Sequence, residues 1–332
     1  MATIYDVARL AGVAPSTVSR VFNGGSVAAE REALVRAAAE ELKFVPDRIA
    51  RRLNRKRSDL VALIIPDIQN PFFTSLARGV EDVAQDAGLS LVLCNADDDE
   101  RKQDRYIEAA KAERMTGAII SPASGSKLDL SHLVGGGTAV VAIDRRPTGH
   151  PIDLVGIDDE RGAETATAHL LEQGYRRIAC LAGPRNALTA RRRLRGYRRA
   201  LRTAGIEPDR RLVQHTNYRE DGGLAAMADL LRSNDPPDAV LATNSLLGVG
   251  AMEALLDADI RPPDIGLVSF SGASWSRLIR PPLTTVWQPA AELGQAAAKL
   301  LIRRQQEPTA AEQSIILETT LFPNQSSARP AP

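Results

Sequence analysis

Four side chains with hydrogen-bonding groups, Ser16, Thr17, Ser19 and Arg20, lie within five residues near the start of the chain. Serine and threonine hydroxyls can bond to phosphate oxygens or to either kind of base edge. An arginine can bind guanine through two hydrogen bonds or hold a phosphate. Side chains of these types on one face of a helix could therefore contact double-stranded DNA.

A second set of polar and aromatic side chains follows short apolar runs in the body of the chain, where such groups could hold a small ligand. For some of them a purely structural role is an alternative. Phe72 could be a core residue, Asp144 could cap a loop, and most of the six arginines between Arg191 and Arg199 could form a solvated helix face. The candidate ligand contacts are Phe72, Phe73, Asp144, Arg191, Tyr218, Asn244, Ser271 and Trp275.

The first set requires two short helices joined at a glycine. Thr3 stands three residues before Asp6, which is the spacing of a capping box at the start of a helix. Gly12 is expected to end this helix. Pro15 suits the first turn of a second helix over about 15–22, since its missing N–H would have had no partner there. The residues expected to face inward are Ile4, Val7, Ala8, Ala11, Val18, Val21 and Phe22.

A third amphipathic stretch, AAEREALVRAAAEELKF over 28–44, is expected to close a small core with Leu34, Val35, Ala38, Leu42 and Phe44. Two short helices around a glycine could also be a simple corner in a helical domain, but the charge distribution favours DNA. Residues 1–57 hold eleven basic and six acidic side chains, a net charge of +5, whereas the whole chain is +1 and the remainder therefore −4. A basic head on an acidic body indicates an anionic polymer as the partner of the head.

The segment VPDRIARRLNRKRSD over 45–59 is rich in basic residues and connects the head to the body. It could be a solvated linker, because isolated helices this short are marginal in water. On DNA it could become ordered, since phosphates would neutralise the arginines and Leu53 could act as an apolar wedge in the minor groove.

The body, from about residue 60 to 320, alternates apolar runs with amphipathic helical stretches. The expected strands are LVALIIP, LSLVLCN, GAIIS, AVVAID, DLVGID, RIACLAG, DAVLATN and IGLVSF. Strands that are apolar on both faces and alternate with helices indicate parallel, doubly wound α/β sheets. Two successive sets of such units predict two lobes, and ligands of such sheets bind where the carboxyl ends of strands face a crevice.

Six motifs can be compared with known families: TIYDVARLAGVAPSTVSRVFN, FVPDRIARRL, IIPDIQNPFF, CLAGP, TARRRLRGY and RPPLTTVWQP. The chain resembles the LacI/GalR (lactose repressor) family of bacterial transcription regulators over residues 3 to about 320. The resemblance implies a helix-turn-helix head, a hinge helix and a core like that of periplasmic sugar-binding proteins. It also implies a homodimer that binds a pseudo-palindromic operator, with an affinity that a small effector changes.

The resemblance also implies roles for individual residues. Phe73 and Tyr218 would stack on the effector, while Arg191 and Asn244 would form hydrogen bonds to it. The DNA contacts would come from Thr3, Pro15, Ser16, Thr17, Ser19, Arg20, Asn23, Ile49, Ala50, Leu53 and Asn54.

Four positions depart from the family pattern. Ala14 and Ala28 stand where the family usually has a serine as helix N-cap, and each loss costs about 1 kcal/mol of local stability. Ser245 and Ser271 stand where many sugar-binding relatives carry aspartate, which suits paired sugar hydroxyls. With Arg191 near a helix N-terminus, these serines favour a sugar acid, a sugar phosphate or another small anion as effector.

Other signals are weaker. Cys94 and Cys180 lie in apolar runs and are expected to be buried, reduced thiols. The aspartates of NADDDERKQD are expected to cap a helix, and the glycines of VGGGTAV lack the spacing of a phosphate-binding loop. The four histidines have no metal-ligand spacing and no catalytic triplet stands out, so we expect no metal, no cofactor and no enzymatic activity. With no signal peptide and no apolar run long enough for a membrane, a cytoplasmic location is expected.

The sequence thus predicts an all-α helix-turn-helix head (1–46), a hinge helix or linker (47–59), a two-lobed α/β core (60–325) and a tail (326–332). Lobe one is expected over about 60–158 and 289–318, and lobe two over about 160–287. The predicted function is that of an effector-controlled transcription regulator, most often a repressor in this family. The alternative is a solute-binding sensor without sequence-specific DNA binding.

Overall fold

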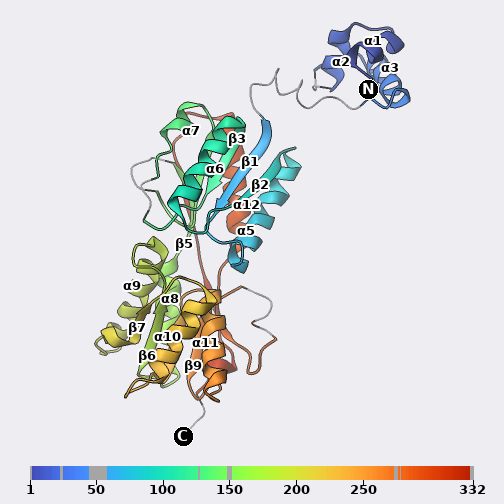
Figure 1. Cartoon of the computed structure of the whole chain (residues 1–332). Coiled ribbons are helices and arrows are strands. Elements are labelled where there is room, and N and C mark those ends of the chain that lie inside the picture. Colours follow the sequence, from blue (N-terminus) through green and yellow to red (C-terminus); the bar gives the residue numbers. More distant parts are fainter. Residues whose placement is uncertain are drawn as a thin grey trace. The chain divides into compact units, whose positions relative to one another are not determined.

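The computed structural model describes residues 2–22, 25–44, 58–125, 128–147, 152–272, 276 and 278–329. They form two compact units, residues 1–58 and 59–332, each of which is described by itself (Figure 1). Most of the predicted hinge over 47–59 lies outside the described residues. So do the predicted contacts Asn23, Ile49, Ala50, Leu53, Asn54 and Trp275.

The described part of the first unit contains the helices α1 (Ile4–Ala11), α2 (Pro15–Phe22) and α3 (Ala29–Glu41). The capping box predicted for the first helix is present. Thr3 Oγ1 accepts a hydrogen bond from Asp6 N at 3.3 Å, and Asp6 Oδ2 accepts one from Thr3 N at 3.0 Å. Gly12 ends α1 with a φ of 65°, a left-handed conformation that glycine adopts without steric cost. The predicted helix-turn-helix is therefore confirmed.

The head is held together by a small core in which valines from all three helices meet. Val7, Val18 and Val35 are fully buried there. The prediction of Leu34 as a core residue is wrong, because its side chain is 51% exposed. Adjacent positions on a helix lie about 100° apart, and the face that buries Val35 and Ala38 turns Leu34 toward solvent.

The second unit contains two six-stranded sheets, one in each lobe (Figure 1). The first sheet has the order β11-β5-β4-β3-β1-β2 and the second has the order β12-β10-β9-β8-β6-β7. The strands of the first sheet are β1 (Ser58–Ile65), β2 (Ser90–Asn95), β3 (Met115–Ile120), β4 (Ala139–Ile143), β5 (Asp153–Ile157) and β11 (Ser314–Leu317). Those of the second sheet are β6 (Ile178–Ala182), β7 (Val213–His215), β8 (Ala239–Ala242), β9 (Gly266–Phe270), β10 (Thr284–Trp287) and β12 (Thr320–Phe322).

Of the nine strand pairs whose register is described, eight are parallel, and β12 runs antiparallel to β10. All eight apolar runs identified in the sequence form strands, and β4, β5 and β6 are buried along their whole length. Helices cover both faces of such strands, which explains why the runs have no polar alternation. The short strands β7, β10, β11 and β12 were not anticipated. β7, β11 and β12 consist of three or four partly exposed residues, which carry little hydrophobic pattern, and the largely buried β10 begins with two polar threonines.

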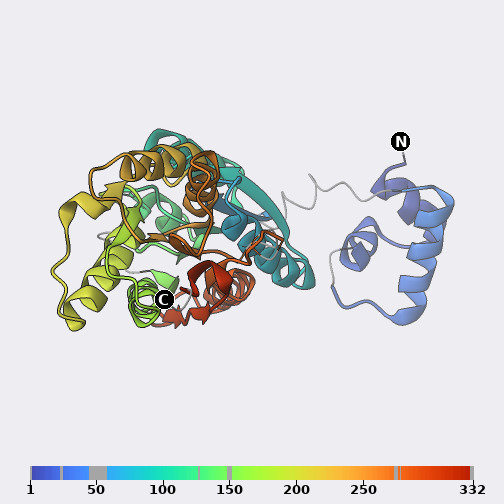
Figure 2. The same ribbon diagram turned by 90° about the horizontal axis from the view of Figure 1, so that it is seen from below.

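Two pairs of helices sandwich each sheet (Figures 1 and 2). Around the first sheet, α5 and α12 pack on one face and α6 and α7 on the other; around the second, α8 and α9 pack on one face and α10 and α11 on the other. The predicted doubly wound fold is therefore confirmed. The bounds are α5 (Pro71–Asp86), α6 (Glu100–Ala112), α7 (Ser131–Gly135), α8 (Asp159–Glu172), α9 (Leu188–Thr203), α10 (Glu220–Leu231), α11 (Ser245–Asp257) and α12 (Ala290–Gln306).

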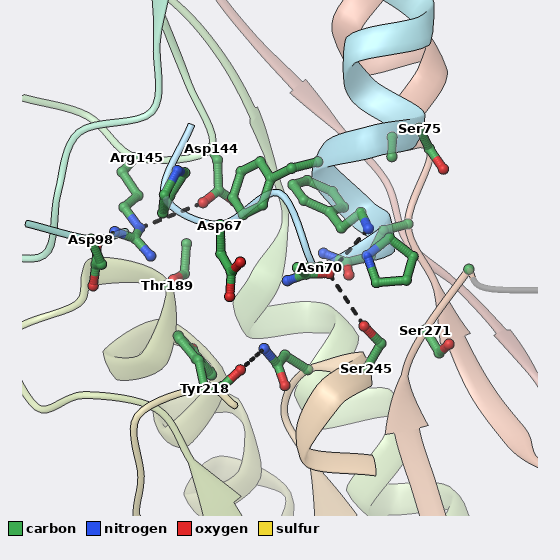
Figure 3. Close-up of a pocket in the computed structure, with 18 of the residues that line it drawn as sticks. Asp67, Asn70, Ser75, Asp98, Asp144, Arg145, Thr189, Tyr218, Ser245 and Ser271 are labelled. Carbon is green, nitrogen blue, oxygen red and sulfur yellow. Dashed lines mark hydrogen bonds and ion pairs between the residues drawn. The ribbon is translucent and has the colours of Figure 1, made fainter. Parts of the chain in front are cut away.

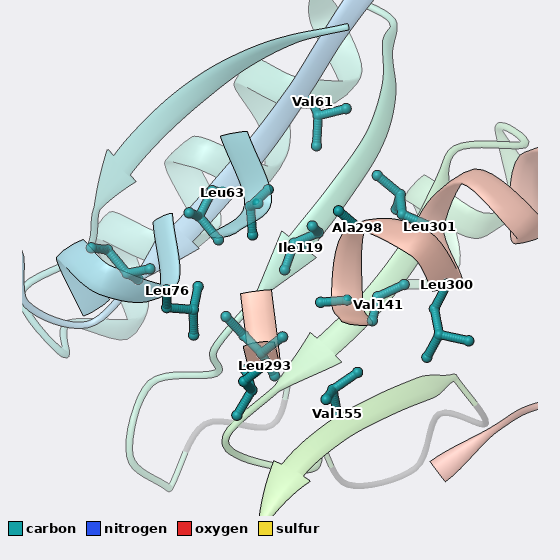
Figure 4. Close-up of a cluster of buried hydrophobic side chains, with 14 of the residues drawn as sticks. Val61, Leu63, Leu76, Ile119, Val141, Val155, Leu293, Ala298, Leu300 and Leu301 are labelled. Atoms are coloured by element: carbon teal, nitrogen blue, oxygen red, sulfur yellow. The ribbon is translucent and has the colours of Figure 1, made fainter. Parts of the chain in front are cut away.

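The core of the first lobe lies between the sheet, α5 and α12 (Figure 4). Leu63, Ile119 and Val141 from neighbouring strands are fully buried there. The two helices approach closely because Gly79 faces Ala291, where an added Cβ would lie 2.0 Å from the carbonyl oxygen. Cys94 and Cys180 are buried free thiols, as predicted.

The chain passes between the two sheets three times within residues 152–272 and 278–329. The passages join β5 to α8, β10 to α12, and β11 to β12. Residues 320–329 thus return to the second lobe, where the 3₁₀ turns η1 (Arg210–Leu212) and η3 (Gln325–Ser327) also lie.

The segment after β12, including the first residues of the predicted tail (326–332), is docked on the second lobe. Ser326 and Ser327 are fully buried. Ser327 Oγ lies 2.7 Å from His169 Nε2 and 2.6 Å from Thr284 Oγ1. Serine gives no hydrophobic signal in a sequence, so this docking could not be read from the residue types.

Candidate functional site

A cavity of about 470 Å³ lies between the two lobes and receives residues from both (Figure 3). Its walls are formed by segments that follow the carboxyl ends of the strands, which is where ligands bind in parallel α/β sheets. Residues of the first lobe that line it include Asp67, Asn70, Phe72, Phe73, Asp97, Asp98, Asp144 and Arg145. Residues of the second lobe and of the passages include Thr189, Arg193, Tyr218, Asn244, Ser245, Ser271 and Gln288.

The structure brings together six of the eight predicted ligand contacts: Phe72, Phe73, Asp144, Tyr218, Asn244 and Ser271 all line the cavity. Trp275 lies outside the described residues. Arg191 is exposed and is not part of the lining, and Arg193 on the same helix lines the cavity instead. Residues two positions apart on a helix point about 200° apart, so the buried face of α9 that carries Arg193 turns Arg191 away.

The aromatic side chains that line the cavity include a pair of phenylalanines, Phe72 and Phe73, and the tyrosine Tyr218. The rings of Phe72 and Phe73 meet edge to face, with centroids 5.0 Å apart and planes at 80°. Phe73 belongs to the core of the first lobe and is 5% exposed, whereas Phe72 is half-buried. Tyr218 has a φ of 62° and lies against Gly183, where a Cβ atom would come within 2.1 Å of its ring. Its hydroxyl is buried without a hydrogen-bond partner among the described residues.

Arg145 lies on the cavity wall of the first lobe and is 6% exposed. Its Nη1 atom donates to Asp98 Oδ1 at 2.6 Å and to the carbonyl of Pro122 at 3.0 Å. Its Nε atom is 3.6 Å from Asp144 Oδ2 and has no hydrogen-bond partner within the described chain. Arg145 was not among the predicted ligand contacts, although it directly follows Asp144 at the end of an apolar run.

Arg193 lies on the opposite wall and is 5% exposed. It donates from Nε to Asp159 Oδ1 at 2.8 Å and from Nη1 to the carbonyl of Thr243, and its Nη2 forms an ion pair with Asp159 Oδ1 at 2.7 Å. Its guanidinium carbon lies 4.4 Å from the centre of the Phe270 ring. Both buried arginines of the cavity are thus already paired with carboxylates of the chain.

Two helix caps meet at the cavity. Asn244 caps α11, since its Oδ1 accepts from Leu247 N at 2.8 Å while its Nδ2 donates to the carbonyl of Tyr218 at 2.9 Å. Asn70 caps α5 in the same way, accepting from Phe72 N at 3.0 Å. Ser245 Oγ then donates to Asn70 Oδ1 at 3.2 Å, a bond that joins the lobes (Figure 3).

Carboxylates outnumber arginines around the cavity. Asp97 and Asp98 belong to the aspartate run that was expected to cap a helix. Only Asp99 of that run does so, accepting from Lys102 N at 3.0 Å. The number of aspartates in this run could have indicated a further role, because a helix needs only one aspartate as its cap. The acidic lining residues are Asp67, Asp97, Asp98, Asp144 and Glu292, and the basic ones are Arg145, Arg193 and Arg219.

The candidate DNA contacts of the head lie on and beside α2. Pro15, Ser16 and Arg20 are exposed, while Thr17 and Ser19 are half-buried. Thr3 is exposed, but its hydroxyl donates to Asp6 Oδ2 at 2.7 Å within the capping box. Of the polar side chains predicted to contact DNA on α2, Ser16 and Arg20 are therefore the exposed ones.

Two further findings limit the chemistry of the described chain. Among residues 2–329, gaps excepted, no group of three or more potential ligand side chains is placed to hold a metal ion. None of the helices described is long and apolar enough to cross a membrane.

A helix-turn-helix unit joined to a two-lobed core with a polar cavity between the lobes defines a ligand-binding regulator of DNA. Residues 3–47 match the model of the bacterial regulatory proteins of the lacI family. Residues 58–323 match that of the periplasmic binding proteins and sugar-binding domain of the LacI family. The chain belongs to the LacI family and is a DNA-binding transcription regulator with an effector-binding domain.

Individual relatives span nearly the whole chain. The ribose operon repressor of Escherichia coli (strain K12) is 36% identical over 326 residues, which are 97% of this chain and 98% of the relative. The structure of the Lac repressor dimer bound to operator and the anti-inducer ONPF has a TM-score of 0.85 at 27% identity, over 99% of both chains. A LacI family regulator from Enterococcus faecium with bound ribose has a TM-score of 0.74 at 30% identity, over 81% of this chain and 98% of that one.

Proposed function

We propose that this protein is a sugar-responsive repressor. As a homodimer it binds a pseudo-palindromic operator, in the cytoplasm and on the DNA of the nucleoid. A small neutral sugar in the cavity between the lobes changes its affinity for that operator.

The choice of a neutral ligand is based on the charged residues that line the cavity. Arg145 and Arg193 are paired with aspartates, so neither offers an uncompensated positive charge to an anion. Carboxylates such as Asp67 and Asp144 also line the cavity, and a carboxylate accepts charge-assisted hydrogen bonds from paired hydroxyls. Ser245 and Ser271 suggested an anionic effector because they replace carboxylates. The carboxylates of the first lobe take the place of those missing ones, so these features support a neutral sugar instead.

The relatives support the same choice. The repressor that is 36% identical over almost the whole chain controls a ribose operon, and a structure of similar fold contains ribose. A pentose or hexose is therefore the first class of ligand to test.

DNA recognition is assigned to the exposed side of α2. Ser16 and Arg20 are exposed there, and both side chains can bond to base edges in the major groove. Since each protomer brings one such helix, a dimer reads two half-sites. A ligand that stabilises one arrangement of the lobes then changes operator affinity by mass action.

Fluorescence anisotropy on DNA from upstream of the protein's own gene tests this proposal, with D-ribose, D-glucose, D-ribonate and ribose 5-phosphate added in turn. We expect specific binding that weakens with salt and is altered by one neutral sugar. A response to the acid or phosphate alone would contradict the neutral ligand. Equal affinity for every DNA sequence would favour a solute sensor without an operator, and light scattering that shows a monomer would contradict the dimer.

A further inference from the structure

Asp159 is a buried carboxylate behind the wall of the cavity. It is the first residue of α8, so it lies at the end of the passage from β5 to the second lobe, and it is 1% exposed. Arg193 Nε donates to its Oδ1 at 2.8 Å and Arg193 Nη2 forms an ion pair with the same oxygen at 2.7 Å, while its Oδ2 is buried without a hydrogen-bond partner in the described part of the chain. Oδ1 thus binds the guanidinium, whereas Oδ2 has no hydrogen-bond partner among the described residues.

Arg193 has donors to spare for a ligand. A guanidinium carries five N–H groups. Nε bonds to Asp159 Oδ1, one N–H of Nη1 bonds to the carbonyl of Thr243, and Nη2 forms an ion pair with Asp159 Oδ1. Because Arg193 lines the cavity, a ligand there can bond to the N–H groups that remain. The direction of those groups depends on what holds the guanidinium.

We propose that Asp159 is a positioning residue for the effector. Its ionised carboxylate fixes the Arg193 guanidinium so that the remaining N–H groups bond to a sugar, and its protonation loosens the guanidinium and weakens sugar binding. The inference rests on the proposed function, since it takes the ligand to be a neutral sugar.

The surroundings of Asp159 place its protonation near physiological pH. Burial raises the pKa of Asp159 to about 6, and the negative charge of Asp144 also raises it, whereas Arg193 and Arg192 oppose the rise. Tyr218, two residues before α10, is a titratable group that also interacts with Asp159. The proton would bind to Oδ2, which accepts no hydrogen bond from the described residues.

Calorimetric titration with D-ribose at pH 7.5 and pH 5.5 tests the role of the carboxylate. The proteins compared are the wild type, D159N and the control E160Q. Glu160 is the next residue, but it forms ion pairs with Arg195 and Arg199 on the surface of the lobe. About 97% of a group with a pKa of 6 is ionised at pH 7.5 and about 24% at pH 5.5, so wild-type affinity is expected to fall about fourfold.

We expect E160Q to keep the wild-type affinity and pH profile. D159N retains an oxygen for Arg193 but no titratable charge, so its affinity at pH 7.5 is expected to be lower than that of the wild type. The fourfold decrease in sugar affinity between pH 7.5 and pH 5.5 should be absent in D159N. A D159N protein with the affinity and pH profile of the wild type would overturn the proposal while leaving the sugar-responsive function intact.

Crystal structures of the wild type and D159A without sugar provide a test that needs no ligand. We expect the Arg193 guanidinium to leave its place over Phe270 in D159A, and an unmoved guanidinium would overturn the proposal. If D159A does not fold, the D159N crystal at pH 7.5 takes its place, with weaker density for the guanidinium expected. A displaced guanidinium in a protein that binds no sugar would mean that the ligand class is wrong and the positioning role correct.

Discussion

Ser245 donates a hydrogen bond of 3.2 Å to Asn70, a residue 175 positions earlier in the chain and in the other lobe. Both residues are at helix N-termini, since Ser245 begins α11 and Asn70 caps α5. A second bond joins the lobes where Asn186 Nδ2 donates to the carbonyl of Ser124 at 2.9 Å. The arrangement of the lobes in this structure is thus held by hydrogen bonds between the lobes themselves.

Removing the first of these bonds should favour the open arrangement. In Ser245→Ala the Asn70 cap of α5 remains, but the bond between the lobes is lost, at a cost of about 0.5–1.5 kcal/mol. We expect a larger radius of gyration by small-angle X-ray scattering without ligand, and sugar binding that is weaker by roughly two- to tenfold. Ser233→Ala is the matched control, because Ser233 Oγ bonds only to the carbonyl of Leu230 among the partners described. An unchanged radius and affinity in Ser245→Ala would contradict this role.

Arg20→Ala should weaken operator binding. If this exposed arginine contacts a base, the loss is expected to be about 1–3 kcal/mol and to relax the preference at one base pair. If it contacts a phosphate, binding should weaken equally on all sequences and the salt dependence should become less steep. Anisotropy over a series of salt concentrations distinguishes the two. The control is Arg36→Ala on α3, whose side chain is paired with Glu32 at 2.7 Å; an effect as large as that of Arg20→Ala would argue against a specific role for α2.

Ala28→Ser should stabilise the head. Ala28 is the N-cap of α3 and forms no side-chain hydrogen bond there. A serine oxygen could accept from a backbone N–H of the first turn, which is worth about 0.5–2 kcal/mol. Hydrogen exchange at the first turn of α3 in the full chain should slow accordingly, while exchange in α11 stays the same. Faster exchange in α3 would show that the backbone at this position does not suit a serine cap.

The contribution of His169 to the unfolding free energy of the core should decrease as the solution becomes acidic. Burial lowers the pKa of His169 below its ordinary value of 6.5, so the unfolded chain takes up this proton before the folded chain does. The contribution of His169 is absent well above pH 6.5, and stability is lost as the pH falls below 6.5. Asp159, whose pKa is raised to about 6, acts in the opposite direction in both proteins, so the measured quantity is the difference between wild type and His169→Gln. In urea unfolding between pH 5 and pH 8, the wild type should lose stability relative to His169→Gln as the pH falls. An identical pH dependence in the two proteins would mean that other groups cause it.

The pattern of apolar residues predicted most of the fold, because buried parallel strands need side chains of one kind along their whole length. It predicted the cavity less well, since the direction of a single side chain depends on the phase of its helix. Arg191 and Arg193 are two residues apart in an arginine-rich segment, and only packing against Asp159 and Phe270 distinguishes them. Gln288 was missed for a related reason: it is isolated in the sequence, and its place at the cavity follows from the passage between the lobes.

The return of residues 320–329 to the second lobe has a practical consequence. The core enters the fold through β1 in the first lobe, yet its last described residues are anchored on the second, where Arg329 Nη1 bonds to the carbonyl of Gly174 at 2.6 Å. Fluorophores attached near residues 59 and 329 would therefore sit on opposite halves of the molecule. Energy transfer between them would report the opening and closing of the cavity in real time. The core could therefore serve as an optical sensor of its ligand without any change to its fold.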